Sequence, residues 1–203
     1  MRYLASVHRR FVILIASTLG SGLFGAAVSA IPSPSSTTLF WVGNFSAPWA
    51  VLPFIAGWAQ RSWKTAACAG LLADLACVVG FYASFLTLDP TELGLPSSAS
   101  LTTLIWTTVS RWILFAAPWL LLATGAGTLY GLIGAWWGRS RARLAGAALA
   151  APFFAEPWIW PVYNGHYQGP LGVWVCEVIV GVAVLVWVGM LRRRMAVNSL
   201  VSR

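Results

Sequence analysis

FVILIASTLGSGLFGAAVSAI, residues 11–31, is a run of apolar and small residues without a charged side chain. About 20 such residues can cross the ~30 Å hydrocarbon core of a bilayer as a helix, whereas the apolar region of a signal peptide has only about 7–15. Five further runs of this kind follow, at about 39–59, 65–88, 112–137, 142–162 and 170–191. The sequence therefore predicts an all-α, polytopic membrane protein with six transmembrane helices in a single domain, 1–203.

The composition is that of a protein whose main solvent is lipid. Hydrophobic residues make up 59% of the chain and charged residues only 9%, whereas a soluble domain carries about 25% charged residues. Thirteen tryptophans fit this interpretation, because Trp collects at membrane interfaces. The net charge of +8 comes from short basic clusters between apolar runs rather than from a continuous basic stripe. We therefore expect the lipid bilayer as a partner, and no nucleic acid.

The distribution of Lys and Arg predicts the orientation of the chain. Twelve of the thirteen fall in the two terminal segments and in the connections around 60–64 and 138–143. The alternate connections contain none, and the thirteenth basic residue, Arg111, stands at the start of the fourth span. The positive-inside rule then places both termini in the cytoplasm, in a multi-pass protein of the bacterial inner membrane. The segment 100–109 is too short to cross and is either an interfacial helix or an extension of the fourth span.

Three of the five acidic residues, Asp74, Glu156 and Glu177, fall inside predicted spans. A charged side chain at the centre of a transmembrane helix costs about 2.5–3.5 kcal/mol, so such residues usually face the interior of a bundle. Glu156 lies in the outer third of the fifth span and Glu177 in the outer half of the sixth. Because the connection between these spans is short, we expect antiparallel neighbours with both carboxyl groups at similar depth.

Each of these two glutamates shares a helix face with a tryptophan. Trp160 follows Glu156 by four residues, and Trp174 precedes Glu177 by three. A carboxylate beside an aromatic face suits a cation or a nitrogen heterocycle, through charge and cation–π attraction. The two tryptophans are therefore expected to form an aromatic wall.

Other polar side chains are predicted to reach the same depth. Asn44 lies near the outer end of the second span, His166 lies in the connection above the glutamates, and Arg111 is expected to hold or compensate one carboxylate. Two interpretations stay open for this cluster, a ligand site or a structural network. The residues expected to bind a ligand are Asn44, Arg111, Glu156, Trp160, His166, Trp174 and Glu177.

Prolines surround Glu156 in the stretch APFFAEPWIWP. Pro152, Pro157 and Pro161 each remove a backbone donor, and Pro157 also biases Glu156 away from helical geometry. We therefore expect a broken helix at this depth, of the kind that transporters use where backbone lines a cavity.

Asp74 lies near the middle of the third span, beside a face of small residues suited to close helix packing. That face consists of Ala66, Gly70, Ala73, Cys77 and Gly80. Two roles stay open for Asp74: a protonated side chain bonded to a neighbouring helix, or a proton or ion relay.

The first span carries small residues at four-residue spacing around Gly20, Gly22 and Gly25. Such spacing favours close helix–helix contact. The contact is either with another helix of the chain or with a membrane partner.

Enzyme signatures are missing from the sequence. It has no HExxH motif, no P-loop and no recognisable nucleophile context, and its three cysteines show no CxxC spacing. We expect no enzymatic activity, no cofactor and no metal site. An intramembrane enzyme that uses Glu156 and His166 is the alternative.

Two stretches, 43–83 and 155–174, resemble a family of uncharacterised bacterial membrane proteins of about 200 residues, a domain of unknown function. The residues that carry this resemblance are Asn44, Ser46, Trp49, Gly80, Phe81, Tyr82, Glu156, Trp158, His166 and Tyr167. The resemblance implies six spans and a site shared by Asn44, Glu156 and His166. The architecture is also similar to the substrate-binding components of energy-coupling-factor vitamin importers, whose first span contacts a coupling subunit.

The expected function is therefore to bind or transport a small cationic or nitrogen-containing solute through an outward-facing pocket. The competing interpretation is a non-transporting assembly or scaffold protein, in which the polar cluster is structural and the first span docks a partner.

Overall fold

The fold was analysed in a computed structural model that describes residues 2–30, 47–83, 85–163 and 171–201, with side chains for 11–30, 47–83, 85–159 and 171–190. Within these ranges the chain forms helices and connections and no strand, which confirms the all-α prediction. The helices are α1 (Arg2–Ser29), α3 (Ala47–Trp58), α4 (Trp63–Ala83), α5 (Leu101–Ser140), α6 (Arg143–Tyr163) and α7 (Leu171–Val201).

Four helices are long and apolar enough to cross a membrane. They are Phe11–Ser29 of α1, Trp63–Ala83 (α4), Leu101–Ser140 (α5) and Leu171–Met190 of α7. They correspond to the first, third, fourth and sixth predicted spans. The chain is therefore a multi-pass membrane protein.

The other two predicted spans are not confirmed. The described part of the second span is α3, whose 12 residues cover about 18 Å, less than the ~30 Å that a crossing needs. The fifth span corresponds to α6, which has 21 residues but is not among the helices apolar enough to cross within the searched residues. Glu156 and the prolines lower its hydropathy. Six crossings, and the cytoplasmic location of the termini, stay predictions.

The expected break in the proline-rich stretch is not found. Helix α6 runs without interruption from Arg143 to Tyr163, through Pro152, Glu156 and Pro157. The local bias against helical geometry before a proline is overridden, because tertiary packing holds Glu156 in the helix. The broken-helix prediction is therefore wrong for this segment.

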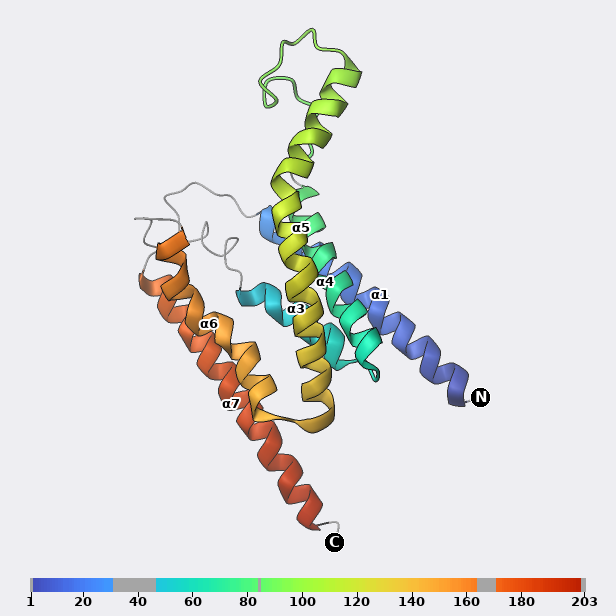
Figure 1. Ribbon diagram of the computed structural model, residues 1–203, viewed down its shortest axis with the longest axis vertical. Helices are drawn as coiled ribbons and strands as arrows, with labels where there is room; N and C mark the ends of the chain where they lie inside the picture. Colours follow the sequence, from blue (N-terminus) through green and yellow to red (C-terminus); the bar gives the residue numbers. More distant parts are fainter. Residues whose placement is uncertain (1, 31–46, 84, 164–170, 202–203) are drawn as a thin grey trace.

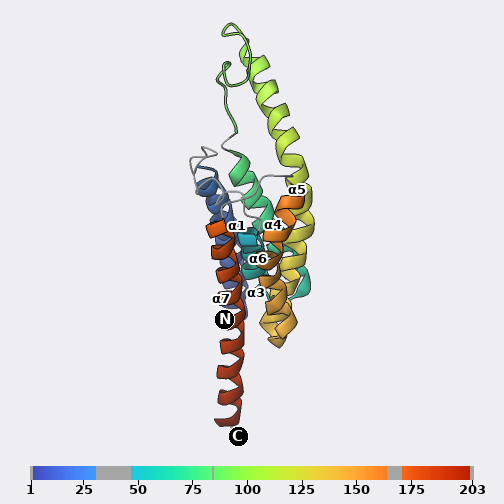
Figure 2. The same cartoon turned by 90° about the vertical axis from the view of Figure 1, so that its left-hand side faces the viewer.

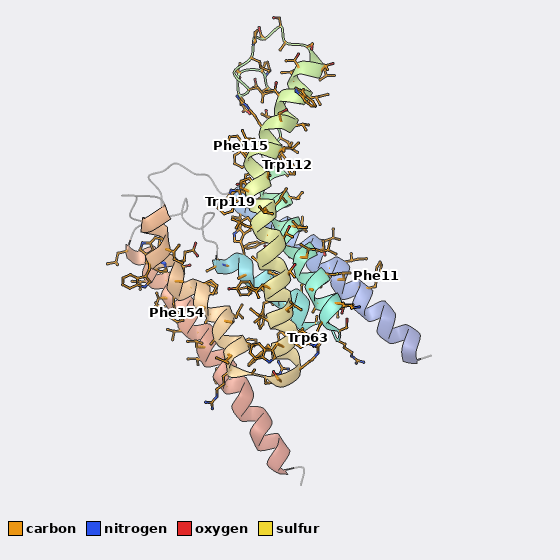
Figure 3. The ribbon with its side chains drawn as sticks, viewed as in Figure 1. Phe11, Trp63, Trp112, Phe115, Trp119 and Phe154 are labelled. Carbon is orange, nitrogen blue, oxygen red and sulfur yellow. The ribbon has the colours of Figure 1, made fainter. Side chains whose placement is uncertain are left out.

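Helix α5 is about twice as long as a membrane crossing requires. Its 40 residues span about 60 Å, and Ser100 caps its start by accepting a hydrogen bond from the Thr103 N–H at 3.2 Å. The segment 100–109 thus belongs to an extension of the fourth span. The first part of α5 and the connection before it extend beyond the other helices, and Trp112 and Phe115 lie along this upper half (Figures 1, 2 and 3).

Small residues bring α1, α4 and α5 close together. A Cβ atom added at Gly127 would lie 2.8 Å from the Gly70 carbonyl oxygen, and one added at Gly25 would overlap the backbone of Cys77. Gly80 faces the backbone of Gly22 in the same way. The predicted small-residue face of α4 is confirmed, with α5 on one side and α1 on the other.

Helices α6 and α7 form a hairpin beside this group (Figure 1). A buried cluster joins the hairpin to α3 and α5; it consists of Phe54, Trp137, Ala145, Leu149 and Val188. The hairpin is therefore fastened to the rest of the fold at the end where α6 begins.

The connections that follow α3 and α5 lie at one end of the molecule, the end toward which α1 begins and α7 finishes (Figure 1). There Arg139 donates to the Arg61 carbonyl oxygen at 2.6 Å, and its guanidinium lies 4.0 Å from the ring centroid of Trp63 (Figure 3). The segments rich in Lys and Arg, which were predicted to share one side of the membrane, thus lie at one end of the molecule.

Candidate ligand-binding cavity

Glu156 lies on the face of α6 that meets α3. Its side chain is only 5% exposed, and its Oε2 atom accepts a hydrogen bond from the Ala47 N–H at 2.8 Å. Ala47 is the first residue of α3, so this bond joins two helices through residues that are 109 positions apart in sequence.

This contact explains why a carboxylate stands in an apolar stretch. The first N–H groups of a helix have no partner inside the helix, and water is not available to them in the interior of a membrane protein. A carboxylate supplies an acceptor, and its charge is favoured at the positive N-terminal end of the helix dipole. Glu156 therefore caps a short helix from a neighbouring element.

Glu177 has a different environment, although it is equally buried at 5% exposure. Neither of its carboxylate oxygens makes a hydrogen bond of ordinary geometry among the described residues, but the carboxyl group of Glu156 lies within reach of one. Its carboxyl group interacts electrostatically with that of Glu156, so the expected proximity of the two glutamates is found. Unpartnered buried carboxyl groups are costly and call for a specific explanation.

The Glu177 side chain lines a cavity of about 390 Å³. This volume lies within the range of about 300–1,000 Å³ that is usual for small-molecule sites. The wall comes from four helices: α1, α3, α6 and α7. Its residues are Phe24, Pro48, Val51, Leu52, Phe153, Cys176, Glu177 and Val180. Glu177 is the charged residue in an otherwise apolar wall.

The cavity lies within the predicted thickness of the membrane. Glu177 is six residues after the start of α7 at Leu171, which places it about 9 Å along the helix axis. Phe24 also belongs to a membrane-crossing segment, Phe11–Ser29. The site therefore lies between helices long and apolar enough to cross a membrane.

Several residues of the predicted site cannot be placed in it. Asn44, His166 and the side chain of Trp160 lie outside the described residues. Trp174 is half-buried and does not line the cavity. The aromatic wall that the sequence assigned to Trp160 and Trp174 comes, in the described part of the cavity, from Phe24 and Phe153.

The structure does not bring Arg111 to the glutamates. Arg111 lies on the projecting part of α5, where it donates to the carbonyl oxygens of Glu92 at 3.1 Å and Leu93 at 2.9 Å. The expected pairing with Glu156 or Glu177 is therefore wrong. Arg111 instead fastens the connection 85–100 to α5, together with a hydrogen bond from Thr108 to the Thr87 carbonyl oxygen.

The same connection has its own ordered turn at Asp89. The Thr91 hydroxyl and N–H groups both donate to Asp89 Oδ1, at 2.6 and 2.8 Å. These bonds favour the carboxylate form, and the pKa of Asp89 is lowered from its ordinary value. The connection therefore keeps its negative charge at neutral pH.

Replacing Arg111 with alanine is expected to loosen this connection without disturbing the cavity. Loss of two hydrogen bonds at roughly 0.5–1.5 kcal/mol each should speed proteolysis within residues 85–100 about 5- to 150-fold, measured by limited digestion in detergent. Glu92→Gln is the matched control, because only the backbone carbonyl of Glu92 is used by Arg111. Equal cleavage of both variants would contradict this role.

Asp74 lies away from the cavity, at the contact between α4 and α5. It is 5% exposed, and a Cβ atom added at Gly127 of α5 would come within 2.7 Å of the Asp74 Cβ atom. The location between two helices agrees with a packing role. The relay role stays a prediction, and Asp74 is not part of the wall around Glu177.

The glycines of α1 are largely used inside the chain. Gly22 and Gly25 face α4, at Ala76 and Cys77, whereas Gly20 has no atom within 4 Å of an added Cβ among the described residues. Of the two alternatives left open for this face, contact with another helix of the chain is therefore found at Gly22 and Gly25, and a membrane partner stays a prediction. Of these three glycines, Gly20 alone faces open space in the described part of the fold.

Most of the cavity wall was missed by sequence reasoning. Phe24, Val51, Phe153 and Val180 are ordinary apolar residues of helices, and no spacing rule distinguishes a cavity wall from a lipid-facing surface. Cys176 had one signal, its position next to Glu177 in the sequence.

Comparisons with known proteins add no relative. No protein-family model, no curated protein and no solved structure matches the chain. The two resemblances inferred from sequence, to the uncharacterised six-span family and to the vitamin importer components, thus stay predictions.

Proposed function

We propose that this membrane protein binds a small organic cation, with an amine or another cationic nitrogen, in the cavity beside Glu177. Binding would be one step of its transport across the membrane. The observation that supports the proposal is the Glu177 side chain, which is buried, lines a cavity of about 390 Å³ and carries a carboxyl group whose nearest described polar neighbour is the carboxyl group of Glu156.

The electrostatics of the wall favour a cation. No Lys or Arg belongs to the described lining, and the neighbouring Glu156 adds further negative character. A cationic nitrogen would supply the missing donor to Glu177 and offset the desolvation of its charge. Phe24 and Phe153 provide aromatic faces for the apolar body of the ligand, and a ring close to the nitrogen would add cation–π attraction.

The competing function, an assembly protein without a ligand, has less support. It depended on a free small-residue surface on α1, and Gly22 and Gly25 are covered by α4. The structural interpretation fits Glu156, which caps α3, but it does not explain why Glu177 also lines a cavity. An intramembrane enzyme has no supporting observation in the described residues.

Glu177→Gln tests the proposed site. Binding of phenethylamine to the purified protein in lipid nanodiscs is expected to weaken about 10- to 100-fold, because a hydrogen bond to a charged partner contributes about 1.5–3 kcal/mol. Glu92→Gln removes the same charge from the exposed connection and should bind as the unchanged protein does. Equal affinity of all three proteins would overturn the proposal.

A further inference from the structure

We infer that the cavity is open sideways to the bilayer, between α1 and α7, and takes an amphiphilic amine dissolved in the membrane. This inference rests on the proposed function and names the class of ligand and its route. Glu177 differs in exposure from the residues beside it on α7.

Within the membrane-crossing part of α7, the cavity wall contains both buried and exposed residues. Glu177 is buried, whereas Cys176 is exposed and Val180 is 45% exposed. An exposed side chain in a membrane-crossing segment faces lipid rather than water. The wall of the cavity therefore continues onto the lipid-facing surface of α7.

The opposite rim is formed by α1, through Phe24. In the described parts of the chain, α1 packs along α4 and α3, and α7 packs along α6, with no extended contact between α1 and α7. The floor between them is the short helix α3, which supplies Pro48, Val51 and Leu52. Among the described residues, the cavity thus has walls on three sides and an open side between two membrane-crossing helices.

The chemistry of the wall narrows the class of ligand further. A carboxyl group in an apolar wall matches a molecule with one cationic nitrogen and an apolar body. A zwitterionic phospholipid headgroup fits poorly, because no basic residue in the described lining could bind its phosphate. A single-chain alkylamine has the matching charge and shape, and it concentrates in the bilayer from which the open side is reached.

Cys176 provides a native reporter for occupancy. When Cys68 is replaced with serine, Cys176 is the one exposed cysteine among the described residues, because Cys77 is buried. The protein is reconstituted in nanodiscs, and N-ethylmaleimide labelling of Cys176 is followed by mass spectrometry. The probes are ethylamine, butylamine, hexylamine, octylamine and the neutral 1-octanol.

Alkylamines are expected to protect Cys176 with an apparent affinity that rises about fourfold per methylene group. Octanol should not protect, because it lacks the charge that Glu177 binds. Val180→Trp, which fills the open side, should weaken protection by octylamine at least tenfold. The matched control is Ile179→Trp, because Ile179 is exposed on the same turn but is not part of the wall.

Each failure has a distinct meaning. If ethylamine protects as well as octylamine, or if Val180→Trp and Ile179→Trp behave alike, access from the bilayer is wrong while cation binding survives. If octanol protects as well as octylamine, the cavity is a general lipid site. If no amine protects Cys176 and phenethylamine does not bind, the proposed function itself is wrong.

Discussion

Replacing Glu156 with alanine is expected to destabilise the fold by about 1.5–3 kcal/mol, the usual range for a hydrogen bond to a charged group. The Ala47 N–H would lose its acceptor at 2.8 Å, in a buried position where water cannot replace it. The start of α3 should then detach from α6. Thermal unfolding in mild detergent, followed by the fluorescence of a thiol-reactive dye, measures the effect.

Two further variants separate this capping role from a general effect of charge. Glu156→Gln keeps a side-chain carbonyl oxygen and should lose less stability than Glu156→Ala. Glu177→Gln breaks no described hydrogen bond and removes a buried carboxyl group, so its stability should be unchanged or higher. If Glu177→Gln were as destabilising as Glu156→Ala, the distinction between a capping glutamate and a ligand-binding glutamate would fail.

Replacing Gly131 with alanine is expected to cost about 1–3 kcal/mol, the usual range for overpacking a well-packed interior. An added methyl group would overlap the carbonyl oxygen of Ala66 and lie 3.0 Å from the Gly70 Cα atom. Both are backbone atoms, so a change of side-chain rotamer cannot relieve the overlap. Helices α4 and α5 would have to move apart, and the unfolding temperature should fall.

The matched control lies in the same helix, six residues earlier. An alanine at Gly125 would meet no atom within 4 Å among the described residues, and alanine is also the better helix former. Gly125→Ala should therefore leave the unfolding temperature unchanged or raise it slightly. A similar loss for both variants would mean that the flexibility of glycine in α5, rather than close contact with α4, is what matters.

The two glutamates illustrate how similar sequence signals lead to different roles. Both are intramembrane carboxylates beside aromatic residues, and both are 5% exposed. Sequence reasoning placed them correctly near each other, because a short connection makes α6 and α7 antiparallel neighbours. It could not assign their partners, since the N-terminus of α3 and the part of the cavity wall on α1 and α3 come from segments more than 100 residues away.

For Arg111, sequence reasoning assigned a partner, and that partner was wrong. A lone basic residue at the predicted outer edge of a span was an obvious partner for a buried carboxylate. The hydrogen bonds of Arg111 to Glu92 and Leu93 depend on the length of α5, which carries the residue away from the bundle. Hydropathy alone could not place the start of that helix, because the segment 100–109 is apolar enough to be either an interfacial helix or an extension of the fourth span.

Composition and hydropathy were sufficient to predict an all-α membrane chain, four helices long and apolar enough to cross a bilayer, and the small-residue face of α4, because burial in a bilayer constrains each helix by itself. The folded arrangement decided the rest: that α3 is short, that Glu156 caps it, and that Glu177 faces a cavity. These features depend on which helices become neighbours, and long-range contacts of this kind leave no periodic signal in any single segment.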